Sequence, residues 1–267
     1  MKILFPTDFS EPSIQALKET VSLNKKLNCE LVILHAYSRP YAEGFDHKGK
    51  LFQLEKRIEK QLENLCKEIP ELNAQNYSFK KVLGDVIDSV IYYTKKESIR
   101  FIVMSTKGAV GMGELFGTKT AKIIKSVDVP VFVVPKDASL LQVSKMGLAC
   151  DYSQKTSADK LDFLNLLADS LKFELDLITL NRDEKTMTID EINNRESLEE
   201  SLGKIPFKSH FVKSSNVEWG LIKYAKTNEL DMITVIPKSY NYIERIFHES
   251  LTQDMAFHSS VPVLVLQ

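Results

Sequence analysis

The sequence predicts an α/β protein made of two tandem five-stranded parallel sheets, each sandwiched by helices. Two observations lead to this fold class. Short apolar segments alternate with amphipathic segments along the whole chain, as they do in doubly wound parallel sheets. The same order of segments then begins a second time near the middle of the chain, which indicates a duplicated domain. We therefore expect domains at residues 1–138 and 139–267, with the boundary in the polar stretch 135–145.

In the first half, each expected strand is an apolar run that ends at a turn, and each expected helix has apolar residues three or four positions apart. The strands are Met1–Thr7, Leu31–Ala36, Tyr77–Leu83, Phe101–Ser105 and Val131–Val134. The helices begin after Ser10, near Lys48, after Asp85 and at Thr118. Ser10 offers a capping hydroxyl and Pro12 lies in the first turn, a combination typical of a helix start.

The second half repeats this order. Its strands are expected at Met146–Asp151, Leu175–Leu180 and Phe207–Val212, with helices near 161–171 and 190–202. The closest internal match aligns VIDSVIYYTKKESIRFIVMSTK (residues 86–107) with VEWGLIKYAKTNELDMITVIPK (residues 217–238). Both halves end on an apolar strand, PVFVV and PVLVL, which would be an exposed edge if it stayed unpaired. We therefore expect the two halves to pair through these strands as an internal pseudo-dimer.

Composition excludes several classes of function. Hydrophobic residues make up 43% of the chain and charged residues 27%, which is typical of a globular protein. The formal net charge of −1 gives no electrostatic reason to expect a nucleic acid or a membrane as partner. The apolar runs are too short to span a bilayer, and MKILFPTDFS lacks the long apolar stretch of a signal peptide. Cys29, Cys66 and Cys150 follow no metal-ligand spacing, so we expect buried free thiols in a cytoplasmic protein.

One segment is rich in glycine: STKGAVGMGELFGTKT, residues 105–120. Glycine lets backbone N–H groups approach an anion closely, and a helix beginning at Thr118 would add its positive end. Lys107 and Lys119 could add charge near phosphates; a flexible structural loop would tolerate the same glycines. Asp8 follows the first strand, where ligands of open α/β sheets bind, but an aspartate there also suits a turn or a helix cap.

With these segments in place, the chain resembles a tandem member of the universal stress protein family. PTDFS, LVILHAY, VMSTKG and GTKTAKIIKSVDVPVFVVP carry the resemblance. It implies an adenine-nucleotide α-hydrolase-like fold and ATP, with magnesium, as ligand. It also implies that the opening aspartate meets the adenine, while the glycine loop and the hydroxyl after it hold ribose and phosphates. The positions of this sequence implied in binding are Thr7, Asp8, Ala36, Met104, Ser105, Thr106, Lys107, Gly108, Gly117, Thr118 and Lys119.

The sequence departs from the family's nucleotide-binding pattern, which is Gly-x-x-Gly, nine residues, and Gly-Ser or Gly-Thr. Ser105 stands at the first glycine, and eight residues instead of nine separate Gly108 from Gly117. In the second half, Ser239 and Glu249 replace both aligned glycines. A carboxylate at that place would repel phosphate, so we expect no nucleotide in the second half.

These observations leave two classes of function. The first is a stress-response protein that binds one adenine nucleotide in its N-terminal half, with a regulatory role and at most slow hydrolysis. The second is a scaffold that binds a protein or a metabolite and whose two nucleotide sites are both degenerate. A hydrolase or phosphotransferase is a third and weaker reading, because the sequence offers no catalytic base and no metal ligand. It also leaves open whether whole chains associate as a homodimer.

Overall fold

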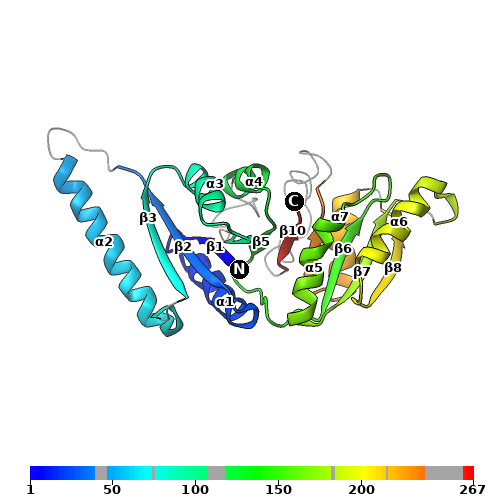
Figure 1. The fold of residues 1–267 in the computed structure, drawn as a ribbon, viewed down its shortest axis with the longest axis horizontal. Coiled ribbons are helices and arrows are strands. Elements are labelled where there is room, and N and C mark those ends of the chain that lie inside the picture. Colours follow the sequence, from blue (N-terminus) through cyan, green and yellow to red (C-terminus); the bar gives the residue numbers. More distant parts are fainter. Residues whose placement is uncertain (40–46, 74–75, 107–117, 182–183, 215, 238–260) are drawn as a thin grey trace.

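The computed structural model of the chain describes residues 1–39, 47–73, 76–106, 118–181, 184–214, 216–237 and 261–267. Its centre is one ten-stranded sheet with helices on both faces (Figure 1). The strand order is β3-β2-β1-β4-β5-β10-β9-β6-β7-β8. Five neighbouring strands come from each half of the chain, in the alternating order of strands and helices that the sequence predicts. The α/β fold class is therefore confirmed.

The strands lie close to their predicted positions. Those of the first half are β1 (Lys2–Pro6), β2 (Glu30–Tyr37), β3 (Tyr77–Leu83), β4 (Phe101–Ser105) and β5 (Val131–Val134). Those of the second half are β6 (Lys145–Cys150), β7 (Glu174–Leu180), β8 (Phe207–Val212), β9 (Met232–Val235) and β10 (Val263–Val265). The inner strands are buried almost throughout. Burial on both faces explains why their sequences are continuous apolar runs.

The two halves meet at an antiparallel strand pair. β5 and β10 lie side by side, with Val131 opposite Val265, Phe132 opposite Leu264 and Val133 opposite Val263. All other neighbouring strands of the sheet run parallel. The predicted pairing of the two halves through their last strands is confirmed, and it merges the two expected sheets into one.

Helices form a layer on each face of the sheet. The helices are α1 (Glu11–Leu27), α2 (His47–Glu68), α3 (Val86–Lys96), α4 (Thr118–Ser126), α5 (Ala158–Leu171), α6 (Ile189–Ser201) and α7 (Val217–Thr227). One core cluster joins the sheet to α1, α2, α5 and α6. A second cluster on the opposite face joins it to α3, α4 and α7. Each cluster contains residues from both halves, so the hydrophobic core is continuous across the joint.

Three phenylalanine rings pack together across the joint between the halves. Phe101 of β4 and Phe132 of β5 are fully buried, and Phe163 of α5 is 2% exposed. Their ring centroids lie 5.5 Å apart for Phe101 and Phe132, 5.2 Å for Phe101 and Phe163, and 6.0 Å for Phe132 and Phe163. These are favourable separations for tilted and edge-to-face aromatic pairs. A helix of the second half therefore packs directly on strands of the first.

The connection between the halves differs from the expected polar boundary. Ala138, Leu140 and Val143 are buried in the core cluster that both halves share. The carboxylate of Glu19 in α1 accepts hydrogen bonds from the Ser139 hydroxyl at 3.0 Å and from the Leu140 N–H at 2.8 Å. Apolar side chains in this mainly polar stretch, together with the hydrogen bonds to Glu19, hold the segment against the core.

A buried carboxylate lies in the second half, on β7. Asp176 is 2% exposed. Its Oδ2 accepts a hydrogen bond from the Tyr224 hydroxyl at 3.0 Å and lies 3.2 Å from Lys145 Nζ. Nε2 of His210 lies 3.3 Å from the other oxygen. A carboxylate can be buried at acceptable cost when partners surround it in this way.

The corresponding place in the first half has a different arrangement. Glu97, at the end of α3, pairs with Lys2 at 3.0 Å and with Lys80 at 3.3 Å. These two lysines lower the pKa of Glu97. The strand registers place Val32 where the second half has Asp176. The carboxylate that pairs with the lysine of the first strand thus lies at the end of helix α3 in the first half and on the inner strand β7 in the second.

We expect incomplete ionisation of tyrosine in the folded protein at alkaline pH. Burial raises the pKa of Tyr152, and burial together with the Asp176 carboxylate raises the pKa of Tyr224. In the unfolded chain both should ionise near pH 10. Their contribution to stability is thus present below about pH 10 and lost as the pH rises further, because the unfolded state releases protons that the folded state keeps.

Ultraviolet absorbance of phenolate measures this. At a pH just above 10, the folded protein should show fewer ionised tyrosines than the same protein in urea. Tyr224→Phe should reduce the difference, because it removes one of the two tyrosines whose pKa is raised. Equal phenolate counts in the folded and unfolded states would contradict the prediction.

Candidate functional site

A pocket opens at the carboxyl ends of β1, β2 and β4, beside the first turns of α3 and α4. Its volume is about 280 Å³. Six of the sequence-predicted positions line it: Thr7, Asp8, Ala36, Met104, Ser105 and Lys119. Five further residues complete the described lining: Pro6, Ser13, Val86, Thr120 and Ile123. The topology thus brings together residues from five separate parts of the first half, at the sheet edge where open α/β proteins bind ligands.

Asp8 forms a turn at one end of the pocket. Its Oδ1 accepts a hydrogen bond from the Ser10 N–H at 3.0 Å, and between them Phe9 has a positive φ of 59°. Asp151 in the second half accepts from the Ser153 N–H at the same distance. Both aspartates therefore have the turn role that the sequence allows. Asp8 also exposes its carboxylate to the pocket, so the two interpretations of this residue are compatible.

The expected hydroxyl cap of α1 is wrong in its detail. Ser10 is the N-cap residue, but its side chain makes no capping hydrogen bond. Its Oγ is buried without a hydrogen-bond partner among the described residues. The Asp8 turn fixes the backbone at this point, because the Ser10 N–H is held by the carboxylate. Pro12 does lie at the start of the helix as predicted.

Thr7 forms a rigid wall of the pocket. Its hydroxyl lies 2.9 Å from the Ser13 hydroxyl and accepts a hydrogen bond from the Phe9 N–H at 3.0 Å. Its N–H donates to the Leu34 carbonyl at 2.8 Å. Thr7 is 7% exposed. Its hydroxyl is thus committed to the local structure, and Thr7 shapes the pocket more than it offers a free polar group.

The opposite side of the pocket belongs to β4 and α4. Met104 is buried and Ser105 is half-buried at the end of β4. Thr106 is buried and donates its N–H to the Val134 carbonyl at 3.0 Å, but it does not line the pocket. α4 begins at Thr118, as the sequence predicts, and exposes Lys119 in its first turn. Lys107, Gly108 and Gly117 lie outside the described residues.

Four of the five lining residues that sequence reasoning missed had recognisable signals. Ile123 lies four positions after Lys119 and three after Thr120, so it shares a face of helix α4 with each of them. Ser13 lies in the first turn of α1, next to the Asp8 turn. Val86 opens α3 after the Asp85 cap, whose carboxylate accepts from the Ile87 N–H at 2.7 Å. Combining helix faces with strand ends would have found these residues.

The described lining combines one carboxylate, one ammonium group and several apolar side chains. Asp8 supplies a hydrogen-bond acceptor at the end of β1, while Lys119 and the first turn of α4 supply positive charge. Ala36, Val86, Met104 and Ile123 supply apolar surface. This combination suits a ligand that has a flat or apolar body, a donor group and a negative charge.

The residues that the structure describes contain no group of three or more His, Cys, Asp or Glu placed to hold a metal ion. Within the same residues, no helix combines the length and hydropathy that crossing a bilayer requires.

The model of the universal stress protein family matches residues 1–135. The chain belongs to the universal stress protein family. The resemblance predicted from the sequence is therefore confirmed.

Individual relatives of this universal stress protein belong to the same family. One universal stress protein of Methanocaldococcus jannaschii is 24% identical over 140 residues, which cover 51% of this chain and 82% of the relative. A second one from the same organism is 25% identical over 158 residues, covering 52% of this chain and 96% of the relative. A solved universal stress protein from Archaeoglobus fulgidus aligns over 100% of this chain and 98% of its own, with a TM-score of 0.73 and 18% identity. That likeness extends the shared fold over the whole length of this chain.

Proposed function

We propose that this universal stress protein binds one adenine nucleotide, ATP, in the pocket between Asp8 and Lys119, and that the bound nucleotide regulates the protein. The polarity of the pocket carries the proposal. An exposed carboxylate at the end of β1 can accept hydrogen bonds from the amino group of adenine. The positive first turn of α4 and Lys119 can attract phosphates, as helix N-termini commonly do.

Magnesium would reach this pocket with the phosphates of ATP. The described lining contains a single carboxylate, that of Asp8. Mg²⁺ bound to nucleotides is often held by one or two carboxylates together with phosphate oxygens and water. Because the described part of the lining offers no second carboxylate, we propose binding and regulation over catalysis of hydrolysis.

We also propose that residues 1–138 and 139–267 are two domains of the universal stress type. The mirrored strand orders support this: β3-β2-β1-β4-β5 on one side and β8-β7-β6-β9-β10 on the other. The Asp8 turn and the Asp151 turn recur at the same place. Cys29, Cys66 and Cys150 form no disulfide, which supports a reducing, cytoplasmic compartment.

The alternative function is a scaffold for a protein or a metabolite with no nucleotide bound. The Asp8 turn favours it, because Asp151 makes the same turn in a half whose aligned glycines are replaced. Asp8 therefore has a structural reason to be present that requires no ligand. Ser105 and the shortened glycine segment also favour the scaffold, because they depart from the family's nucleotide-binding pattern.

Titration calorimetry with ATP and magnesium distinguishes the two functions. We expect one site per chain, and Asp8→Asn should weaken its affinity about tenfold, because the amide offers adenine a poorer acceptor. Asp151→Asn is the matched control, since it alters the same turn in the other half, and it should leave the affinity unchanged. Lys119→Gln should also weaken the binding of ATP, and it should affect the binding of adenosine less.

Three outcomes would count against the proposal. Absence of binding by the wild-type protein, together with no adenine nucleotide released from the purified protein, supports the scaffold. Two equivalent sites would contradict the asymmetry between the halves. A loss of ATP affinity caused by Asp151→Asn but not by Asp8→Asn would place the site in the second half.

A further inference from the structure

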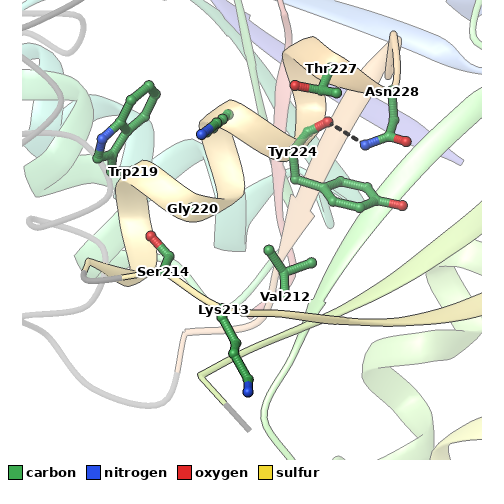
Figure 2. Close-up of a pocket in the computed structure, with 9 residues that line it drawn as sticks. Val212, Lys213, Ser214, Trp219, Gly220, Tyr224, Thr227 and Asn228 are labelled. Carbon is green, nitrogen blue, oxygen red and sulfur yellow. Dashed lines mark hydrogen bonds between the residues drawn. The ribbon is translucent and has the colours of Figure 1, made fainter. Parts of the chain in front are cut away.

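A second pocket lies in the other half of the molecule, between α7 and the segment that follows β8 (Figure 2). Its volume is about 400 Å³, within the range of small-molecule sites. Its described lining consists of Val212, Lys213, Ser214, Trp219, Gly220, Lys223, Tyr224, Thr227 and Asn228. Six of these residues lie along one face of α7 and its C-terminal end, opposite the three that follow or end β8. β8 is also the outer edge of the sheet, so the pocket opens at the rim of the molecule.

The charges beside this pocket are arranged differently from those at the corresponding place in the first half. In the first half, Lys80 reaches from the edge strand β3 to Glu97 at the end of α3, at 3.3 Å. Strand register and helix ends place His210 and Asn228 at the corresponding positions. His210 is shorter than lysine and lies against Asp176, at 3.3 Å. No ion pair between these two positions therefore spans the groove between edge strand and helix in the second half.

A glycine brings the two walls of the pocket close together. A Cβ atom on Gly220 would lie 2.6 Å from the Ser214 Cβ and 2.5 Å from the Leu180 Cδ2. Contacts this short are not tolerated, so only glycine lets α7 pack so closely on the segment after β8. Ser214 fixes that segment by donating its hydroxyl to the Asn216 carbonyl at 2.6 Å. The pocket thus has a defined floor.

Most polar groups of the lining are already used inside the protein. The Tyr224 hydroxyl donates to Asp176, and the Asn228 amide donates to the Tyr224 carbonyl at 3.0 Å. The polar groups left for a ligand are the Lys223 ammonium group, the Trp219 indole and the Thr227 hydroxyl, while the Lys213 side chain extends away from α7 (Figure 2). The Lys223 Nζ lies 5.9 Å from the centre of the Trp219 ring, and Trp219 is 39% exposed. The lining side chains that the structure describes carry two positive charges and no carboxylate.

We propose that this pocket binds a small organic anion built on a flat aromatic ring, such as an arene carboxylate. The ring would lie against Trp219 and the apolar side of the pocket, where an aromatic contact adds to the burial of apolar surface. The anionic group would lie beside Lys223, with Lys213 adding positive potential. This site is separate from the pocket at Asp8, and the proposal holds whether or not that pocket binds a nucleotide.

Trp219 makes the proposal directly testable, because it is the only tryptophan of the chain. Anilinonaphthalene sulfonate is a suitable probe: it is an aromatic anion whose fluorescence rises on binding and is excited by energy transfer from tryptophan. N-phenylnaphthylamine is its neutral counterpart, with the same rings and no sulfonate. We expect saturable binding of the anion with quenching of Trp219, and weaker binding of the neutral molecule.

Lys223→Gln should weaken the affinity for the anionic probe about fivefold, as expected for the loss of one exposed charge contact. The affinity for the neutral probe should stay unchanged. Lys226→Gln is the matched control, because Lys226 lies on the same helix but outside the pocket lining. Naphthoate should displace the probe, and ATP with magnesium should not. Both lysines are exposed, so thermal melting should confirm that both variants fold.

Three results would overturn the proposal. The first is equal weakening by Lys223→Gln and Lys226→Gln, which would show a general charge effect. The second is displacement of the probe by ATP, which would place it in the pocket at Asp8. The third is displacement by an acidic peptide such as decaglutamate at lower concentration than naphthoate, which would identify the occupant as a protein segment.

Discussion

Phe163→Ala should lower the free energy of unfolding by about 3–5 kcal/mol, the usual cost of removing a buried phenylalanine. The side chain is 2% exposed and contacts the rings of Phe101 and Phe132 across the joint between the halves. Truncation would leave a cavity bounded by strands of one half and a helix of the other. Urea unfolding followed by circular dichroism gives the free energy.

Phe52→Ala is the control for this prediction. Phe52 lies on α2 and is 58% exposed, so its loss should change stability by less than about 1 kcal/mol. Wild-type protein should unfold in one cooperative step, because both halves share one core. If Phe163→Ala cost no more than Phe52→Ala, or if the wild-type halves unfolded separately, the shared core would not govern stability.

Lys145→Met should destabilise the protein by about 2 kcal/mol, less than the cost of breaking a fully buried ion pair. Asp176 would remain buried with one charged partner fewer. The value is reduced because the Lys145 side chain is 31% exposed and because Tyr224 and His210 stay in place. Methionine keeps the apolar stem of lysine, so the loss should report mainly the charge.

A double variant measures the interaction between Lys145 and Asp176 separately from the other effects of each substitution. Adding Asp176→Val introduces the residue type that the first half has at the same register position, Val32. It removes the buried carboxylate, and much of the stability lost by Lys145→Met should return in the double variant. Equal and additive losses from the two substitutions in urea unfolding would show that the two groups do not interact.

Most elements were predictable from the sequence because they depend on local patterns. The ends of β3, β4, β5 and β8 and the start of α4 agree with the prediction residue for residue. Gly84 and Pro206 mark two of these ends, because glycine and proline commonly border regular elements. The position of Asp8 followed equally directly, since it is the polar residue after a buried strand.

Other features depend on contacts between distant segments and were not predictable. A mainly polar sequence gave no sign that Leu140 would be buried, because its burial needs Glu19 to hold the backbone. Asp176 interrupts an apolar strand, and only the tertiary fold supplies its partners Lys145, His210 and Tyr224.

The buried segment that links the halves has a consequence for how they can diverge. Two separate copies that pair symmetrically must use one surface that complements itself. Counted back from the left-handed residues that end α1 and α5, Asn28 and Lys172, Phe163 occupies the place of Glu19. One of these residues packs across the joint and the other holds the link. A single covalent chain keeps its halves together at any dilution. Each half is therefore free to acquire residues that no symmetric pair could accept.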